Sequence, residues 1–132
     1  MIKFSRKENQ FLQENEVCRI ATAFRDIPHV VPICYIYLNN SLYFATDYNT
    51  KKYNNILHNN NISIIVDVYD TIEGNKAVLI DGLAYIIEDG EEFKQIYSLF
   101  EKKFKWVRND PWKEGEAPFI KVVINKKVSW GL

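Results

Sequence analysis

The sequence contains few of the residues that crosslink a chain or bind a metal. Its 132 residues include two cysteines and two histidines. Cys18 and Cys34 are not arranged as a C-x-x-C pair, and neither His29 nor His58 stands at ligand spacing from the other or from a cysteine. We therefore expect two thiols in the core and no metal site.

The sequence also lacks a net charge and a long apolar run. Its 17 basic residues balance 17 acidic ones, and the small basic cluster Lys51 and Lys52 is too little to form an electrostatic surface for nucleic acid. The longest apolar run, 30–38, is interrupted by Pro32 and is under half of the ~20 residues that a membrane-spanning helix needs. Residues 1–7 lead into polar sequence without the apolar core of a secretion signal. We expect one cytoplasmic domain over 1–132 that binds neither nucleic acid nor membrane.

The common nucleotide-binding and hydrolase motifs are absent too. The sequence contains no G-x-G-x-x-G, no Walker loop and no G-x-S-x-G. The usual sequence evidence for a Rossmann, P-loop or hydrolase fold is therefore missing.

Strand-forming residues dominate what the sequence does contain. Segments rich in β-branched and aromatic residues alternate with turn residues such as Asp26 and the pair Asn39 and Asn40. Helical spacing is confined to three segments, and 106–117 reads as a polar loop. The predicted strands are 17–24, 28–38, 42–46, 62–69, 76–88 and 119–124, and the predicted helices are 5–14, 50–58 and the stripe 93–104.

These elements predict a mainly β (α+β) fold with a small antiparallel barrel. Every link between strands is short enough for antiparallel pairing, and the three helices are short. A barrel of ~6 strands is filled by its own side chains. A ligand is therefore expected on the outside of the barrel or between two copies of the chain.

The residues between 44 and 56 indicate a phosphate site. A strand ends in Ala45 and Thr46, and a helix begins after Thr50 with Lys51 and Lys52. Free backbone N–H groups, the positive end of the helix and two ammonium groups would converge on one spot. The alternative is that Thr50 only caps the helix and that the lysines are solvated surface.

This region gives the sequence its resemblance to a known family. Segments 19–22 and 28–33, followed by Thr46, Thr50, Lys52, Asn55 and Asn59, resemble the pyridoxamine-phosphate-oxidase-like family of FMN-binding split barrels, from about residue 15 to the C-terminus. The resemblance implies a six-stranded antiparallel split β-barrel with three short flanking helices. It also implies a homodimer with flavin at the subunit interface.

The resemblance further implies which residues bind FMN. Thr46, Thr50 and Lys52 would hold the phosphate, and Lys51 stands where Arg or Lys is usual. The backbone of the second strand would lie along the isoalloxazine ring, and a polar contact would come from near Lys76. Trp106 could flank the ring or only cover the mouth of the barrel. The full set of expected cofactor-binding residues is Val30, Val31, Pro32, Ile33, Ala45, Thr46, Thr50, Lys51, Lys52, Asn55, Lys76 and Trp106.

We expect an FMN-dependent oxidoreductase with a small-molecule substrate, and its hydride chemistry requires no acid or base from the protein. The Arg-and-His segment with which pyridoxamine-phosphate oxidases hold their substrate is missing, so vitamin B6 oxidation is not expected. The alternatives are a reductase that uses the deazaflavin coenzyme F420 and a flavin carrier or sensor without turnover. Haem binding on a related split barrel would need His29 or His58 as axial ligand.

Overall fold

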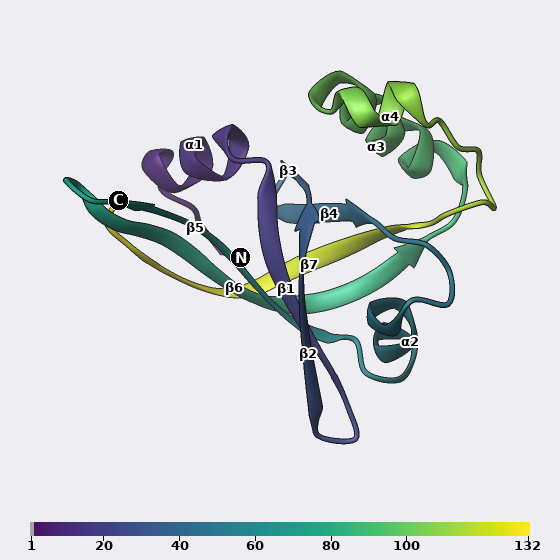
Figure 1. Ribbon diagram of the computed structural model, residues 1–132, viewed down its shortest axis with the longest axis horizontal. Coiled ribbons are helices and arrows are strands. Elements are labelled where there is room, and N and C mark those ends of the chain that lie inside the picture. Colours follow the sequence, from purple (N-terminus) through teal and green to yellow (C-terminus); the bar gives the residue numbers. More distant parts are fainter. Residues whose placement is uncertain (1) are drawn as a thin grey trace.

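Seven strands form one curled antiparallel sheet in the computed structural model, which describes residues 2–132 (Figure 1). The sheet order is β2-β1-β5-β6-β7-β4-β3, so β2 and β3 are its two edges. The strands are β1 Val17–Phe24, β2 Ile27–Cys34, β3 Ile36–Leu38, β4 Ser41–Ala45, β5 Asn61–Asp70, β6 Gly74–Ile87 and β7 Phe119–Trp130. The helices are α1 Arg6–Glu14, α2 Lys51–His58, α3 Gly90–Lys103 and α4 Lys105–Asn109. The predicted mainly β, α+β fold class is confirmed.

Local sequence signals set the first two helices and the tight turns. Ser5 and Glu8 form a reciprocal capping box at the start of α1, and the Thr50 hydroxyl accepts the Tyr53 N–H at the start of α2. The predicted turn residues Asn39 and Asn40 both have positive φ, which asparagine adopts more readily than most residues. These caps and turns are confirmed predictions.

The sheet separates two apolar cores. The inner face packs against α1 and α2, through residues such as Leu12 and Ile56. The outer face is covered at one end by α3 and α4, where Phe100 and Val107 pack against Tyr43 and Phe119. Each helix therefore contributes one apolar side to a core.

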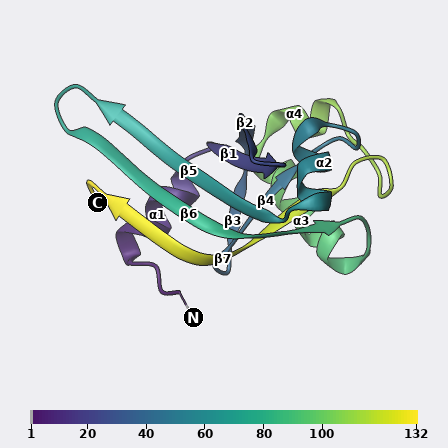
Figure 2. The same cartoon turned by 90° about the horizontal axis from the view of Figure 1, so that it is seen from below.

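Part of the outer face carries no core residues. Five residues lie side by side there across β2, β1, β5, β6 and β7, and none belongs to either core. Figure 2 shows the long strands β5, β6 and β7 in front of α1. Val30, near this row, is 66% exposed and Val128 is 48% exposed. We call this surface the open face; its row is Pro32, Arg19, Ile65, Leu79 and Val128.

The structure differs from the predicted elements at three places. The predicted strand 28–38 is two strands, because the chain leaves β1 at the fully buried Tyr35 and pairs with β4 instead. The predicted loop 106–117 begins with the short helix α4, and β7 extends to Trp130 because it follows the long β6. Residues 2–132 therefore form seven strands and four helices, rather than the predicted six and three.

The longest helix of residues 2–132 is α3, with 14 residues. No helix in this part of the chain is long and apolar enough to cross a membrane.

Candidate functional site

Two hydroxyl groups meet between the end of β4 and the start of α2. The Oγ1 atoms of Thr46 and Thr50 lie 3.0 Å apart, and each lies 3.2 Å from the carbonyl oxygen of Asp47. The connection turns at Asn49, whose φ is +68°. Thr46 is buried, whereas Thr50 is half-buried. This short turn brings the two predicted threonines together.

Lys52 places a positive charge beside these hydroxyls. Its side chain is half-buried, and burial lowers the pKa of its ammonium group, which the nearby Asp47 partly offsets. Among residues 2–132, Lys52 forms no ion pair within 4.0 Å. Because the first N–H groups of an α-helix have no helical carbonyl to bind, the amides of Lys51 and Lys52 add donors at the same end of α2. The arrangement suits an anion.

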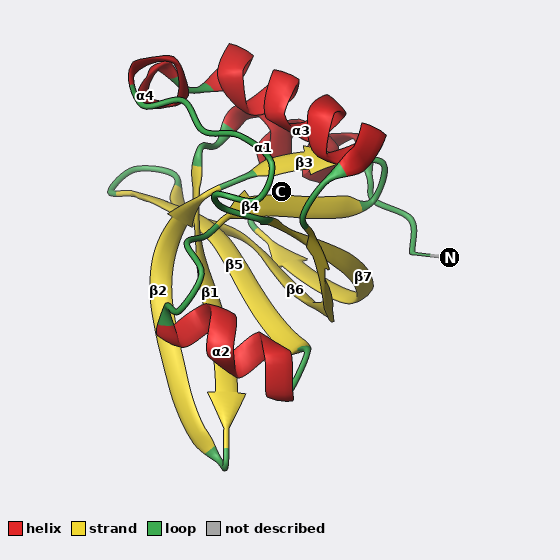
Figure 3. Ribbon diagram, turned by 90° about the vertical axis from the view of Figure 1, so that its right-hand side faces the viewer, coloured by secondary structure: helices red, strands yellow, loops and turns green. Residues whose placement is uncertain are grey.

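A cavity of about 450 Å³ opens beside this end of α2. Figure 3 looks onto this side of the molecule, with α2 below and with α4 and the loop after it above. The cavity is lined from both sides, by the end of β4 and by the segment after α3. Its lining residues are Ile33, Ala45, Thr46, Asp47, Lys52, Trp106, Asp110, Pro111, Trp112, Glu116 and Ala117.

Five of the predicted site residues therefore share one cavity: Ile33, Ala45, Thr46, Lys52 and Trp106. Thr50 does not line the cavity, but its hydroxyl contacts the hydroxyl of Thr46, which does.

The predicted ring-binding strand lies at the sheet edge. Val31 and Ile33 are half-buried against the inner core, whereas Val30 and Pro32 point the other way and are exposed. Because β2 is an edge strand, its backbone is paired on one side only, with β1. A flat ligand could lie along its free side.

The structure does not bring Asn55 and Lys76 to this cavity. The buried Asn55 amide donates to the Thr22 hydroxyl at 3.1 Å, so it anchors α2 to β1. Lys76 lies on β6, three strands away from β2, with its Nζ 2.8 Å from Glu73 Oε2. Lys51 is exposed at the start of α2.

Six lining residues are not among the predicted cofactor-binding residues, and four of these six have acidic or aromatic side chains. Asp47, Asp110, Trp112 and Glu116 come from loops, where no periodicity marks which side chains face a ligand. The indole Nε1 of Trp112 is the one buried side-chain polar atom of residues 2–132 without a hydrogen-bond partner. The one available signal was the density of aromatic and acidic residues within 106–117.

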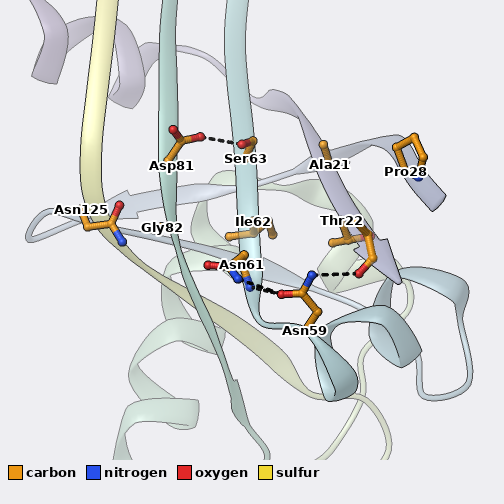
Figure 4. A pocket seen from close by; sticks show the side chains of 11 residues that line it. Ala21, Thr22, Pro28, Asn59, Asn61, Ile62, Ser63, Asp81, Gly82 and Asn125 are labelled. Carbon is orange, nitrogen blue, oxygen red and sulfur yellow. Dashed lines mark hydrogen bonds between the residues drawn. The ribbon is translucent and has the colours of Figure 1, made fainter. Parts of the chain in front are cut away.

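A second hollow, of about 470 Å³, lies on the outer side of the sheet (Figure 4). Six of its eleven lining residues have polar side chains. Ser63 donates to Asp81 at 2.5 Å, Asn61 Nδ2 donates to Asn59 Oδ1 at 2.9 Å, and Asn59 Nδ2 donates to the carbonyl of Ala23. None of the predicted cofactor-binding residues lines it.

The cysteines and histidines form no cluster in the described chain. Cys18 is buried in the inner core, and burial raises the pKa of its thiol to about 12. Cys34 packs against the outer core, where burial raises its pKa and a hydrogen bond with Trp106 partly offsets the effect. His58 is exposed, and its Nδ1 lies 2.8 Å from the Asn54 carbonyl. Residues 2–132 contain no group of three side chains that could hold a metal ion.

Comparison with known proteins decides the family. The family profile described as pyridoxamine 5'-phosphate oxidase matches residues 4–131, almost the whole chain. The chain belongs to the pyridoxamine 5'-phosphate oxidase family. No curated protein matches the sequence.

Solved structures agree with this family fold. A FAD-binding protein from Mesorhizobium loti is 26% identical, with a TM-score of 0.78 over 96% of this chain and 94% of that one. A FAD-binding protein from Mycobacterium smegmatis is 22% identical, with a TM-score of 0.71 over 96% and 95%. HutZ, the heme storage protein of Vibrio cholerae, is 16% identical, with a TM-score of 0.80 over 96% and 94%. This fold is thus found in two proteins described as binding FAD and in one described as storing haem.

Proposed function

We propose that the protein binds FMN and is an oxidoreductase with a small-molecule substrate. The observation that carries the proposal is the group at the start of α2: two threonine hydroxyls 3.0 Å apart and a half-buried Lys52 that has no ion-pair partner in residues 2–132. A phosphate dianion could accept hydrogen bonds from both hydroxyls in place of the Asp47 carbonyl, and it would give Lys52 an ion-pair partner. Family membership and the flavin-binding relatives support a flavin as the group that carries this phosphate.

In this proposal, each part of the site positions the cofactor. Thr46, Thr50 and Lys52 hold the phosphate, and the exposed Lys51 adds charge at the entrance. The free edge of β2 over Val30, Val31, Pro32 and Ile33 lies along the ring, and Trp106 closes the cavity from the other side. The bound flavin would supply the hydride-transfer chemistry, so the protein contributes position, exclusion of water and electrostatics.

The proposal includes a homodimer with flavin at its interface. The open face exposes apolar side chains, among them Val30, Val128 and Trp130, which is 40% exposed. Exposed apolar surface of this kind is typical of protein interaction sites. Because β2 lies at the edge of the open face, a second copy packed there would cover the ring.

The residues that line the cavities weigh against two of the alternatives. The long acidic tail of a deazaflavin coenzyme would meet three carboxylates in this cavity, from Asp47, Asp110 and Glu116. Haem would require His29 or His58 as axial ligand, and neither lines either of the two cavities described above. A flavin carrier without turnover would use the same phosphate site, so only an experiment distinguishes it from an oxidoreductase.

The experiment is to denature the purified protein and identify the released cofactor by absorbance and mass. We expect FMN in a ratio approaching one per chain. Release of FAD or of a deazaflavin would replace FMN in the proposal. A protein that carries no flavin and binds none in titration would contradict it. The rates of reduction and reoxidation of the bound flavin are then compared with those of free flavin. If no electron donor or acceptor tried reacts faster with the bound flavin, the protein is a carrier.

A further inference from the structure

One wall of the cavity beside α2 is built from two stacked indoles. The ring centroids of Trp106 and Trp112 lie 6.0 Å apart, and the planes differ by 6°. Phe104 stacks on Trp106 at 5.9 Å, and Tyr97 contacts Trp112 edge-on at 4.9 Å. Trp106 is nevertheless 42% exposed. The wall is therefore held in place by its neighbours and still offers aromatic surface to a ligand.

The same cavity has an excess of negative charge. Asp47, Asp110 and Glu116 line it together with a single cation, Lys52, which gives a formal charge of −3 + 1 = −2. Within residues 2–132, none of the three carboxylates forms an ion pair within 4.0 Å. The bound phosphate of the proposed function would occupy Lys52. The exposed carboxylates of Asp110 and Glu116 on the loop after α4 would then still have no ion-pair partner within 4.0 Å in residues 2–132, although Glu116 accepts the backbone N–H of Lys113 at 2.7 Å.

We infer that the end of the cavity formed by Trp106, Trp112, Asp110 and Glu116 binds a flat, positively charged heteroaromatic substrate. A cation is attracted to the face of an indole ring, and most strongly where water is partly excluded. Two carboxylates at the same end add Coulomb attraction. A neutral ring of the same shape would stack on the indoles but would lack the cation–π and Coulomb attraction. The inference rests on the proposed function, because the substrate would meet the flavin in this one cavity.

The test uses three probes that share a pyridine ring and differ in charge. These are 1-methylnicotinamide, a cation, nicotinamide, which is neutral, and nicotinate, an anion. Each is titrated into the FMN-loaded protein, with binding followed by tryptophan fluorescence and calorimetry. We expect the cation to bind about tenfold more tightly than the neutral probe, or better, and the anion to bind most weakly.

Variants show whether the named carboxylates cause this preference. The double change Asp110→Asn with Glu116→Gln should reduce the cation preference to about threefold or less. Glu114→Gln is the matched control, because Glu114 lies on the same loop but does not line this cavity. It should leave the preference unchanged. Asp110→Asn alone should give an intermediate preference and serves if the double variant does not fold.

The outcomes separate the inference from the proposed function. A protein that holds FMN but binds the three probes equally, or binds none of them, overturns the inference and leaves the proposed function intact. If the protein holds no flavin, the proposed function fails, and the same titration on the flavin-free protein still decides the inference. A cation preference that survives the double variant also overturns it.

Discussion

Glu8 shows how a single residue joins distant parts of the chain. Its carboxylate is buried beneath α1, where it receives hydrogen bonds from the Ser5 N–H at 2.8 Å, the Ser129 hydroxyl at 2.6 Å and the Lys127 ammonium. Burial alone would raise the pKa of Glu8, but the bonds from Lys127 and Ser129 outweigh it and lower the pKa to about 2. The capping box was predictable from the spacing of Ser5 and Glu8. The contact with Lys127 was not, because it depends on how β7 passes under α1.

This pKa makes the stability of the fold depend on pH. Because the pKa of Glu8 in the folded protein lies below the ordinary glutamate value of 4.5, the unfolded state takes up the proton first as pH falls. The stabilisation is complete above about pH 4.5 and is lost progressively toward pH 2. We expect Glu8→Gln to remove this contribution, worth about 3 kcal/mol at most. Urea unfolding between pH 3 and pH 7 measures it.

The exposed Glu14 on the same helix provides the control for this measurement. Glu14→Gln should keep the wild-type dependence on pH. If wild type and Glu8→Gln lose stability in parallel between pH 4.5 and pH 3, the ion pair does not act as described.

At the scale of elements, a buried hydrogen bond ties α2 to β1, in addition to the packing of Ile56 in the inner core. Asn55 connects it to Thr22 on β1, and this contact fixes where the Thr50 end of the helix lies. The resemblance of the sequence to the flavin-binding family had suggested cofactor binding for Asn55. The structure gives its side-chain amide a partner inside the protein, and cofactor binding by Asn55 stays a prediction.

A double-mutant cycle tests this role of Asn55. Asn55→Ala leaves the buried Thr22 hydroxyl without its partner, so we expect a loss of about 1 to 3 kcal/mol in the free energy of unfolding. Adding Thr22→Val should cost little more, because the unpaired hydroxyl is then removed. The neighbouring exposed Asn54→Ala should change stability little. Strictly additive losses from the two changes would argue against the bond.

Elements with clear periodicity were predictable and those set by tertiary contacts were not. The helix α3 follows from its apolar stripe, and the hairpins follow from their turn residues. The break at Tyr35 could not be predicted, because the hydroxyl of Tyr35 reaches the Leu12 carbonyl at 2.6 Å and Lys103 donates to its carbonyl. These partners are distant in sequence. The same holds for the loop after α4, whose side chains complete the cavity.

At the scale of the whole molecule, the open face is the feature that a single chain leaves unexplained. We expect it to be covered by a second copy, so the protein should sediment as a dimer at micromolar concentration. Val128→Asp places a charge in this face and should shift the population toward monomer by at least about tenfold in the dissociation constant. Ser98→Asp, on the exposed side of α3, should not. A wild-type monomer that binds FMN at full affinity would contradict the interface position of the flavin.

The central claim is that the start of α2 holds a phosphate, and comparing FMN with riboflavin in the Lys52→Ala protein tests it most directly. Removing the ammonium deletes a charge-assisted hydrogen bond worth about 1.5 to 3 kcal/mol, so FMN should bind roughly tenfold to a hundredfold more weakly. Riboflavin has no phosphate, and its affinity should stay within about twofold of wild type. Lys126→Ala, an exposed lysine on β7, should change neither. If Lys52→Ala weakens FMN and riboflavin equally, or weakens neither, then Lys52 does not hold a phosphate and the site proposed here is wrong.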